Sequence, residues 1–176
     1  MKIAVVGDTH RNMELLSKVA EWCCERQKTA ALYHLGDDYC DMATLGERDM
    51  DVVQVPGIYD EGYRNGTLAA KAHESVLGLQ ILLVHSLEKD LAPDDRTACD
   101  VILYGHTHKA EMRLEDGHFY MNPGHLKADK DKNMAATFGI LDIQDRHVSA
   151  TVYDMAFKPV QRLEMTRSEN GLYKAT

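Results

Sequence analysis

The stretch IAVVGDTH at residues 3–10 decides the fold class. Its first four residues are apolar and largely β-branched, as in a short strand that is buried on both faces. Gly7 ends this run, and two residues that can bind a metal, Asp8 and His10, follow at once. In an open α/β sheet, ligands bind in the crevice outside the carboxyl ends of the strands. The stretch therefore predicts an α/β protein with its chemistry at the strand ends.

Three further apolar runs end in the same way. The polar clusters that follow them are GDD at 36–38, HS at 85–86 and GHTH at 105–108. A fifth run ends in PGIYD at 56–60, where Ile58 stands at the place of a ligand and cannot coordinate a metal. Strand ends that converge on Asp and His predict a metal-centred active site at one edge of the sheet.

Strands and helices alternate in the first third of the chain. Apolar residues recur at steps of three and four over residues 12–27, which favours a helix with one buried face. Apolar runs at 30–35 and 52–55 predict the second and third strands, and a shorter helix is expected at 42–48. This β-α-β-α-β order predicts a parallel sheet with right-handed crossovers.

The remainder of the chain is dominated by strands joined by tight turns. The expected strands are 74–77, 80–84, 101–104, 111–114, 118–121, 137–143 and 148–153. Alternation over 148–153 predicts one solvated face, and residues 87–99 are expected to be irregular to helical. We expect an α/β fold of two mixed sheets packed face to face with helices outside, in a single domain over 1–166. A polar, frayed tail is expected at 167–176.

Composition narrows the function. The net charge of -8 and the pI near 5.5 disfavour strong nucleic-acid binding, because neutralising a phosphate backbone needs clustered Lys and Arg. Divalent cations would supply positive charge for an anionic substrate. The apolar run after Met1 is too short for a signal peptide and no later run could span a membrane, so we expect a cytoplasmic protein without a membrane partner. The four cysteines suit neither a disulfide framework nor a zinc ribbon and are expected to be reduced.

The ligand types favour a transition metal. Carboxylates mixed with imidazoles suit Mn, Fe, Zn, Ni or Co better than Ca or Mg alone. Asp8 and His10 are two residues apart, so in an extended segment they can point to one side, and the same spacing recurs at His106 and His108. Asp37, at a strand end between these pairs, could bridge two ions. Two metals about 3.5–4 Å apart are a standard device for displacement at phosphorus.

The order D-x-H, G-D, P-G-x-x-D, V-H and G-H-T-H resembles the calcineurin-like metallophosphoesterase superfamily. It is most similar to the small single-domain bacterial and archaeal phosphodiesterases, and YMNPG at 120–124 resembles a strand and loop of that subfamily. The similarity spans about residues 1–155. It implies a four-layer αββα sandwich and hydrolysis of phosphate esters, in the first place phosphodiesters, by a metal-bound hydroxide at a dinuclear centre. Manganese is the first expectation among the metals, with one or two ions per chain.

The resemblance also implies roles for single residues. Asp8, His10 and His108 would bind the first metal, Asp37 would bridge, and His85 and His106 would bind the second metal. The family has an Asn ligand followed by His or Cys in the segment after the third strand, where this chain has Ile58 and Tyr59, so the second site loses a protein ligand. Tyr59 and Asp60 are the candidate catalytic residues: a phenol can donate a proton or bind phosphate. The alternatives are packing for Tyr59 and, for Asp60, orientation of the loop or service as a metal ligand in place of Ile58.

Other polar residues have plainer interpretations. Asp38 is expected to cap the following helix rather than to bind metal, and His34 is expected to be structural. His125 lies near the rim, and contact with substrate or service as a substitute ligand stays open. The histidines expected at the surface, away from the strand ends, are His73, His118 and His147.

Three functions follow from these observations. The first is a phosphoesterase that acts on a small phosphate ester, whose identity the loops do not reveal. The second is a catalytically weak scaffold protein, because the superfamily also includes a retromer subunit in which the fold serves interactions. The third is an enzyme with one metal. The sequence leaves both a monomer and a homo-oligomer open.

Overall fold

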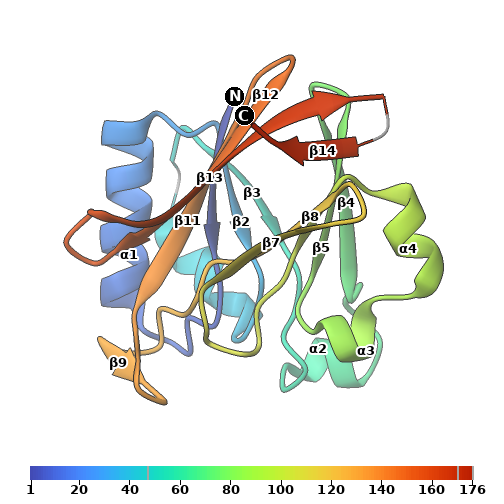
Figure 1. The fold of residues 1–176 in the computed structure, drawn as a ribbon. Coiled ribbons are helices and arrows are strands. Elements are labelled where there is room, and N and C mark those ends of the chain that lie inside the picture. The colour runs from blue at the N-terminus through green and yellow to red at the C-terminus, as the bar shows by residue number, and fades with distance from the viewer. Residues whose placement is uncertain (47, 170, 176) are drawn as a thin grey trace.

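The computed structural model describes residues 1–46, 48–169 and 171–175 and contains two large sheets (Figure 1). The seven-stranded sheet has the order β14-β13-β12-β11-β1-β2-β3 and the five-stranded sheet the order β4-β5-β6-β8-β7. The strands of the first sheet are β1 (Lys2–Val6), β2 (Ala31–His34), β3 (Asp51–Gln54), β11 (Thr137–Ile143), β12 (His147–Asp154), β13 (Pro159–Ser168) and β14 (Gly171–Lys174). Those of the second are β4 (Lys71–Val76), β5 (Leu79–Val84), β6 (Val101–Leu103), β7 (Glu111–Glu115) and β8 (His118–Asn122).

Helices cover the outer faces of the sheets. The α-helices are α1 (Met13–Trp22), α2 (Glu61–Arg64), α3 (Leu87–Asp90) and α4 (Pro93–Ala98), with a π-helical turn η1 (Cys23–Gln27) and a 3-10 helix η2 (Tyr39–Leu45). Figure 1 shows α1 beside the first sheet and α3 and α4 on the far side of the second. A small hairpin of β9 (Lys130–Asp131) and β10 (Met134–Ala135) projects from the body. The expected α/β sandwich of two mixed sheets flanked by helices is confirmed.

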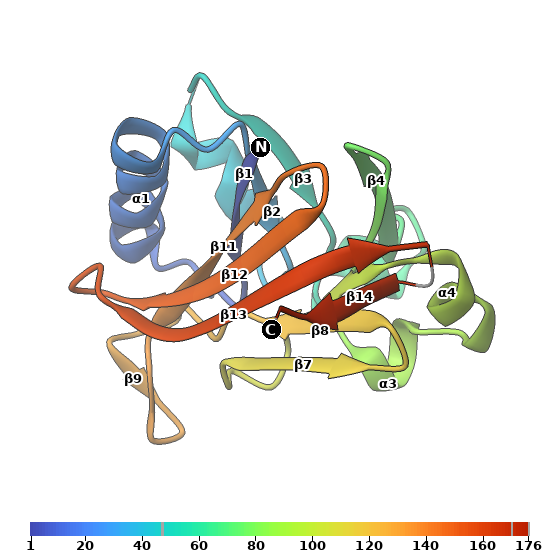
Figure 2. The same cartoon turned by 45° about the horizontal axis from the view of Figure 1, so that its top comes forward.

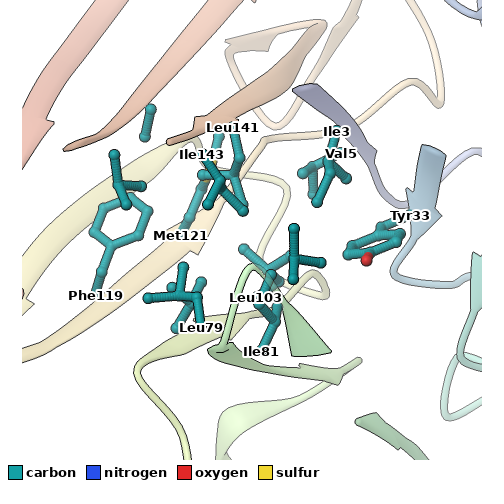
Figure 3. Packing of buried hydrophobic residues seen from close by; sticks show 14 of the residues in the cluster. Ile3, Val5, Tyr33, Leu79, Ile81, Leu103, Phe119, Met121, Leu141 and Ile143 are labelled. Carbon is teal, nitrogen blue, oxygen red and sulfur yellow. The ribbon is translucent and has the colours of Figure 1, made fainter. Parts of the chain in front are cut away.

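The main core fills the space between the two sheets (Figure 3). Ile3 and Tyr33 come from β1 and β2 of one sheet, and Leu103 and Phe119 come from β6 and β8 of the other. All four are at most 1% exposed. Because the sheets bury their inner faces against each other, loops that follow strands of one sheet can lie beside loops that follow strands of the other. We call the line where these loops meet the seam between the sheets.

A second core lies between the first sheet and α1. The apolar stripe of α1, including Leu16 and Val19, packs on Ala4 and Phe138, which point to the opposite face from the main core. The helix begins after Asn12, whose side chain accepts a hydrogen bond from the Leu15 N–H at 3.2 Å. A third apolar cluster packs α3 against the outer face of the five-stranded sheet.

Parallel pairing places the carboxyl ends of several neighbouring strands on the same side of each sheet. β1 pairs in parallel with β2, and β2 with β3. In the other sheet, β5, β6 and β8 are parallel neighbours. The predicted hairpin with a turn at Asp116 and Gly117 is also present, as β7 and β8. The carboxyl ends of β1, β2, β5 and β6 therefore supply the loops from which the candidate site is built.

Three local predictions were wrong. The helix expected at 42–48 is the 3-10 helix Tyr39–Leu45, while Glu47 lies outside the described residues. The strand β12 is not solvated on one face, because Ser149 and Thr151 are buried in the interior of a seven-stranded sheet. The tail expected to fray from Arg167 instead continues β13 and returns as β14.

The C-terminal hairpin connects the two sheets. Leu172 is 1% exposed, and its N–H donates to the Gly117 carbonyl at 2.8 Å, at the turn between β7 and β8. The Arg167 guanidinium donates to the Leu77 carbonyl at 2.7 Å, at the turn between β4 and β5. Figure 2 shows β14 lying beside β8. A polar sequence is held here by backbone pairing and one buried leucine.

Among the described residues, no helix is both long and apolar enough to cross a bilayer. All four cysteines are free thiols, as the sequence predicted.

Candidate metal centre

Four strand ends bring the predicted ligands together at the seam between the sheets. Asp8 follows β1 and Asp37 follows β2, both in the seven-stranded sheet. His85 directly follows β5, and the GHTH segment at 105–108 follows β6, both in the five-stranded sheet. The site is therefore made jointly by the two sheets.

Two groups of potential ligand atoms are compact. In the described chain, the groups of three or more are Asp8, His10 and His108, and Asp8, Asp37 and His85, each with its ligand atoms within 4.8 Å of one another. Asp8 belongs to both. His10 Nε2 lies 3.2 Å from His108 Nε2, and His108 Nε2 lies 3.5 Å from Asp8 Oδ1.

Asp37 stands between the two sheets. Its Oδ1 is 3.5 Å from His85 Nε2, and its Oδ2 is 3.8 Å from His10 Nε2. Both Asp37 Oδ1 and His85 Nε2 are buried without a hydrogen-bond partner in the described chain. Buried polar atoms are normally satisfied, so two facing atoms of this kind need an explanation. A divalent cation between them would provide one.

The ring of His85 is fixed by the residue that follows β2 in the other sheet. Its Nδ1 lies 2.6 Å from the Leu35 carbonyl oxygen, which can only accept, so Nδ1 carries the proton. The Nε2 lone pair then faces Asp37. This is the arrangement in which a second hydrogen bond orients a histidine for metal binding.

His106 lies at the edge of the second group rather than inside it. Its ring centroid is 5.1 Å from that of His85, and it is half-buried. Its backbone N–H donates to Asp8, at 3.0 Å to Oδ2 and 3.2 Å to Oδ1. His106 therefore contacts the site through its backbone N–H, and its ring lies beside that of His85.

The loops that carry these side chains are held in unusual backbone conformations. Asp8, His10, His106 and His108 all have positive φ. Strain of this kind persists where the surroundings fix it and is common at functional sites. The Asn122 amide fixes the GHTH segment by donating to the Gly105 carbonyl at 2.8 Å and to Thr107 Oγ1 at 3.0 Å.

The electrostatics favour a cation. Burial, with repulsion from Asp37, raises the pKa of Asp8 well above its usual value. Burial also lowers the pKa of His108 to about 4 and lowers the pKa of His10 and of His106. Neutral imidazole is the form that binds metal. A cation in contact with both carboxylates would offset their mutual repulsion and the cost of burying them.

The segment after β3 differs from a ligand loop. Ile58 is only 9% exposed, while the Tyr59 side chain is 71% exposed. The Asp60 carboxylate accepts hydrogen bonds from the Gly57 N–H at 2.7 Å and the Tyr39 N–H at 3.2 Å. These contacts match the alternative in which Asp60 orients the loop.

A cavity of about 450 Å³ opens beside the ligands. It is lined by His10, Arg11, Asp37, Asp38, Tyr59, Asp60, Glu61 and Arg64. Tyr59 therefore borders the space that a substrate would occupy. A second hollow of about 520 Å³, beside Thr29 and Asp51, lies at the amino ends of β2 and β3 and away from the ligands.

The residues with plainer interpretations take varied positions. Asp38 precedes η2 but makes no capping hydrogen bond, and its carboxylate instead pairs with Arg11 at 3.0 Å. His34 is fully buried, and its Nε2 lies 3.2 Å from Thr9 Oγ1. His73 is exposed, whereas His118 and His147 are only partly exposed and hydrogen-bond to the Cys99 carbonyl and to Glu164.

His125 is buried beside the first group. Its ring centroid is 5.3 Å from that of His108, and its Nε2 lies 3.2 Å from the Met134 carbonyl. Its Nδ1 has no partner in the described chain. His125 is not among the compact ligand groups of the described chain, and its ring packs beside that of His108.

Sequence reasoning missed Asp131. Its Oδ2 lies 2.7 Å from His108 Nδ1, and its Oδ1 lies 3.1 Å from Lys127 Nζ. An acidic residue in the lysine-rich stretch KADKDK at 127–132 was the only available signal. Nothing in that pattern distinguishes Asp131 from Asp129.

The fold and the site define a class of α/β sandwich proteins with an Asp and His centre suited to a divalent metal. The chain belongs to the calcineurin-like phosphoesterase superfamily, whose domain matches residues 1–146. No relative was found among curated protein sequences.

Several solved structures share the fold. A predicted phosphoesterase from Streptococcus pneumoniae has a TM-score of 0.70 and 17% identity, with 94% of this chain and 97% of that chain covered. The phosphoesterase YfcE from E. coli has a TM-score of 0.65 and 23% identity, with 93% and 98% covered. Vps29 from Chaetomium thermophilum has a TM-score of 0.70 and 18% identity, with 100% and 98% covered. At these identities the likeness shows the fold alone.

Proposed function

We propose that this protein is a metal-dependent phosphoesterase that acts chiefly on phosphodiesters. The observation that carries the proposal is the pair of compact ligand groups that share Asp8, with the unpaired atoms Asp37 Oδ1 and His85 Nε2 facing each other at 3.5 Å. Membership of the superfamily and the likeness to an archaeal phosphodiesterase support it, the latter with a TM-score of 0.68 and 20% identity over 86% of this chain and 99% of that chain.

Each residue has a role in this proposal. Asp8, His10 and His108 hold the first metal, and His85 and His106 hold the second. Asp37 lies between His10 and His85, where its two oxygens can bridge. When bound, the divalent ions, with manganese the first choice, supply an activated water and neutralise charge on the phosphoryl oxygens.

The remaining groups bind and orient the ester. Arg11 and Arg64 flank the cavity beside the ligands and can pair with phosphate oxygens. The phenol of Tyr59 borders the same cavity and can donate a hydrogen bond to the phosphate or to the leaving oxygen. Asp60 acts indirectly, because its oxygens hold the backbone of the loop that presents Tyr59.

The test is hydrolysis of bis(p-nitrophenyl) phosphate with added Mn²⁺ or Ni²⁺, together with the metal content of the protein. We expect turnover that a chelator abolishes and that His85→Asn lowers by at least about 100-fold, the scale on which metal chemistry contributes. His73→Asn, a substitution at an exposed histidine, is the matched control and should retain the wild-type rate. Metal-loaded protein that hydrolyses no phosphodiester or monoester would overturn the proposal.

A scaffold protein is the second candidate. Several Vps29 structures are similar in fold, and Ile58 occupies the position of a family ligand. Ile58→Asn separates the two functions. For an enzyme with an adapted second site, the substitution should change an already substantial rate by less than about tenfold. A rise of orders of magnitude from a near-zero rate would favour the scaffold.

A further inference from the structure

The hairpin of β9 and β10 places an acidic residue beside a histidine of the first ligand group, which consists of Asp8, His10 and His108. After β8 the chain passes through His125, forms the β9 and β10 hairpin, and returns as β11. Figure 1 shows β9 at the lower left, projecting from the body of the molecule. The only hydrogen-bonded contact between this hairpin's strands and a predicted metal ligand in the described chain is that of Asp131 with His108.

The loop is tied to the protein at its base. The Leu126 N–H donates to the Gly7 carbonyl at 3.2 Å, in the turn that carries Asp8. The Asn12 side chain, at the start of α1, donates to the Lys127 carbonyl at 3.1 Å. The Ala136 N–H donates to the Asp129 carbonyl at 3.0 Å and closes the loop. These contacts fix where Asp131 lies.

The carboxylate of Asp131 is fully engaged. Its Oδ2 lies 2.7 Å from His108 Nδ1, and its Oδ1 lies 3.1 Å from Lys127 Nζ. With the Lys127 ammonium on one oxygen, the carboxylate accepts a hydrogen bond on the other, so Nδ1 of His108 carries the proton. The Nε2 lone pair of His108 then points toward Asp8 and His10, at 3.5 Å and 3.2 Å.

The two ligand groups differ in the acceptor that their histidine hydrogen-bonds through Nδ1. His108 is backed by a carboxylate and is packed on its other side by the ring of His125. His85 is backed by the neutral carbonyl of Leu35. A carboxylate makes the opposite nitrogen of the ring a better donor to metal than a neutral carbonyl does. The first group therefore has support that the second lacks.

We propose that Asp131 is a positioning residue for His108 and that it gives the first site a higher metal affinity than the second. The inference rests on the proposed metal centre and goes beyond it, because to the ligand missing at Ile58 it adds a residue outside the ligand set that strengthens the first site. The hairpin is then a functional part of the site.

The experiment compares metal affinities of four proteins. These are the wild type, Asp131→Asn, Asp131→Ala and the control Asp129→Asn, which removes a charge from an exposed residue of the same loop. Binding of Co²⁺ is measured by competition with a chromophoric chelator, so the readout does not depend on hydrolysis. Asp131→Asn should weaken the first equivalent by about 10–100-fold, and Asp131→Ala should weaken it at least as much. The second equivalent and Asp129→Asn should match the wild type.

Two further measurements separate positioning from folding. The metal-free variants should stay folded and lose no more than about 1–3 kcal/mol of stability, the cost of leaving the buried His108 donor without its partner. In the metal-free wild type, proton NMR of ¹⁵N-labelled histidine should show His108 protonated at Nδ1, and Asp131→Ala should shift the ring toward the other tautomer.

The outcomes are distinct. If the wild type binds no Co²⁺, the proposed metal centre itself fails. If the wild type binds and hydrolyses while Asp131→Asn binds the first equivalent as tightly as Asp129→Asn does, only the role of Asp131 is overturned. Equal weakening of both equivalents would also overturn it, because the effect would not be specific to His108.

Discussion

Asp37 faces histidines from both sheets. It is 4% exposed, with His85 near one oxygen and His10 near the other. It also repels Asp8, and this repulsion contributes to the raised pKa of the Asp8 carboxyl. In the metal-free protein Asp37 therefore opposes stability, whereas with cations bound it would be favourable.

A substitution that removes the charge of Asp37 should therefore raise the stability of the metal-free protein and lower its affinity for metal. Asp37→Asn keeps the size of the side chain and removes one of two buried like charges. We expect the metal-free variant to be more stable by about 1 kcal/mol, or roughly 2–4 °C in Tm. Its affinity for metal should fall by at least about 100-fold, because a bridging carboxylate is lost.

Thermal unfolding in excess chelator and Co²⁺ competition provide the two measurements. Asp129→Asn is the control, because Asp129 is an exposed carboxylate that lies outside both compact groups. A metal-free Asp37→Asn variant that is clearly less stable than the wild type would contradict the electrostatic account.

The individual residues of the site could be predicted from the sequence to different degrees. Asp8, His10 and His108 follow apolar runs directly, so their place at a strand end could be predicted. Asp131 could not, because it is 23 residues away from His108 and lies on a loop whose path has no periodicity. The buried environment of His125 was equally hidden, since it lies in the loop that begins at residues 122–124 and has no periodic pattern.

At the scale of elements, the loop between β3 and α2 controls the position of Asp37. A methyl group added at Gly57 would collide with the Asp37 carboxylate, which a flexible surface side chain could avoid but a buried one cannot. Gly57 is also held by its N–H bond to Asp60. The glycine of the PGIYD segment is therefore needed for space beside Asp37, and no positive φ is involved.

Gly57→Ala should consequently displace Asp37 while leaving the fold intact. We expect hydrolysis and metal affinity to fall by at least about tenfold, with a loss of stability of about 1–3 kcal/mol from overpacking. Gly7→Ala is the control, because a methyl group there would meet its nearest neighbour, Leu35 Cβ, at an ordinary 3.5 Å. Wild-type metal binding by Gly57→Ala would show that the loop can move away without cost.

The elements themselves were predicted well where periodicity is strong. The helix expected over 12–27 is α1 with its π-helical continuation, and the hairpin around Asp116 and Gly117 is present. The C-terminal hairpin was missed because its sequence is polar and its stability comes from pairing with β12 and contact with β8. Burial of Thr151 was missed for the same reason: alternation within one strand does not reveal what packs on either face.

At the scale of the whole molecule, buried neutral histidines should make the metal-free protein sensitive to acid. Burial lowers the pKa of His34 to about 3 and that of His108 to about 4. An imidazole in the unfolded chain titrates near ~6.5. The stabilisation from the neutral rings is therefore complete above about pH 6.5 and is lost as the pH falls from there toward those lower values. Asp8 acts in the opposite direction, because acid relieves the cost of its buried charge.

The buried histidines outnumber Asp8, so we predict that the metal-free protein loses stability as the pH falls. His34 alone should lower the free energy of unfolding by about 1.4 kcal/mol for each pH unit below about 6. Urea unfolding in chelator at several pH values between about 7.5 and 4.5 measures this slope. His34→Gln should flatten it and the exposed-site variant His73→Asn should not. A midpoint that stays constant or rises on acidification would contradict the prediction.

The position of the ligands at the seam has a consequence for assembly of the fold. Asp8 and Asp37 belong to one sheet and His85 and His108 to the other, so neither sheet alone can form a complete ligand group. A bound ion would link the two sheets, in addition to their apolar packing, the C-terminal hairpin and the hydrogen bonds of His85 with Leu35 and of His106 with Asp8. Its binding free energy adds to the stability of the docked state only. The rate at which a chelator removes the ion would then measure how often the two sheets separate at the ligand groups.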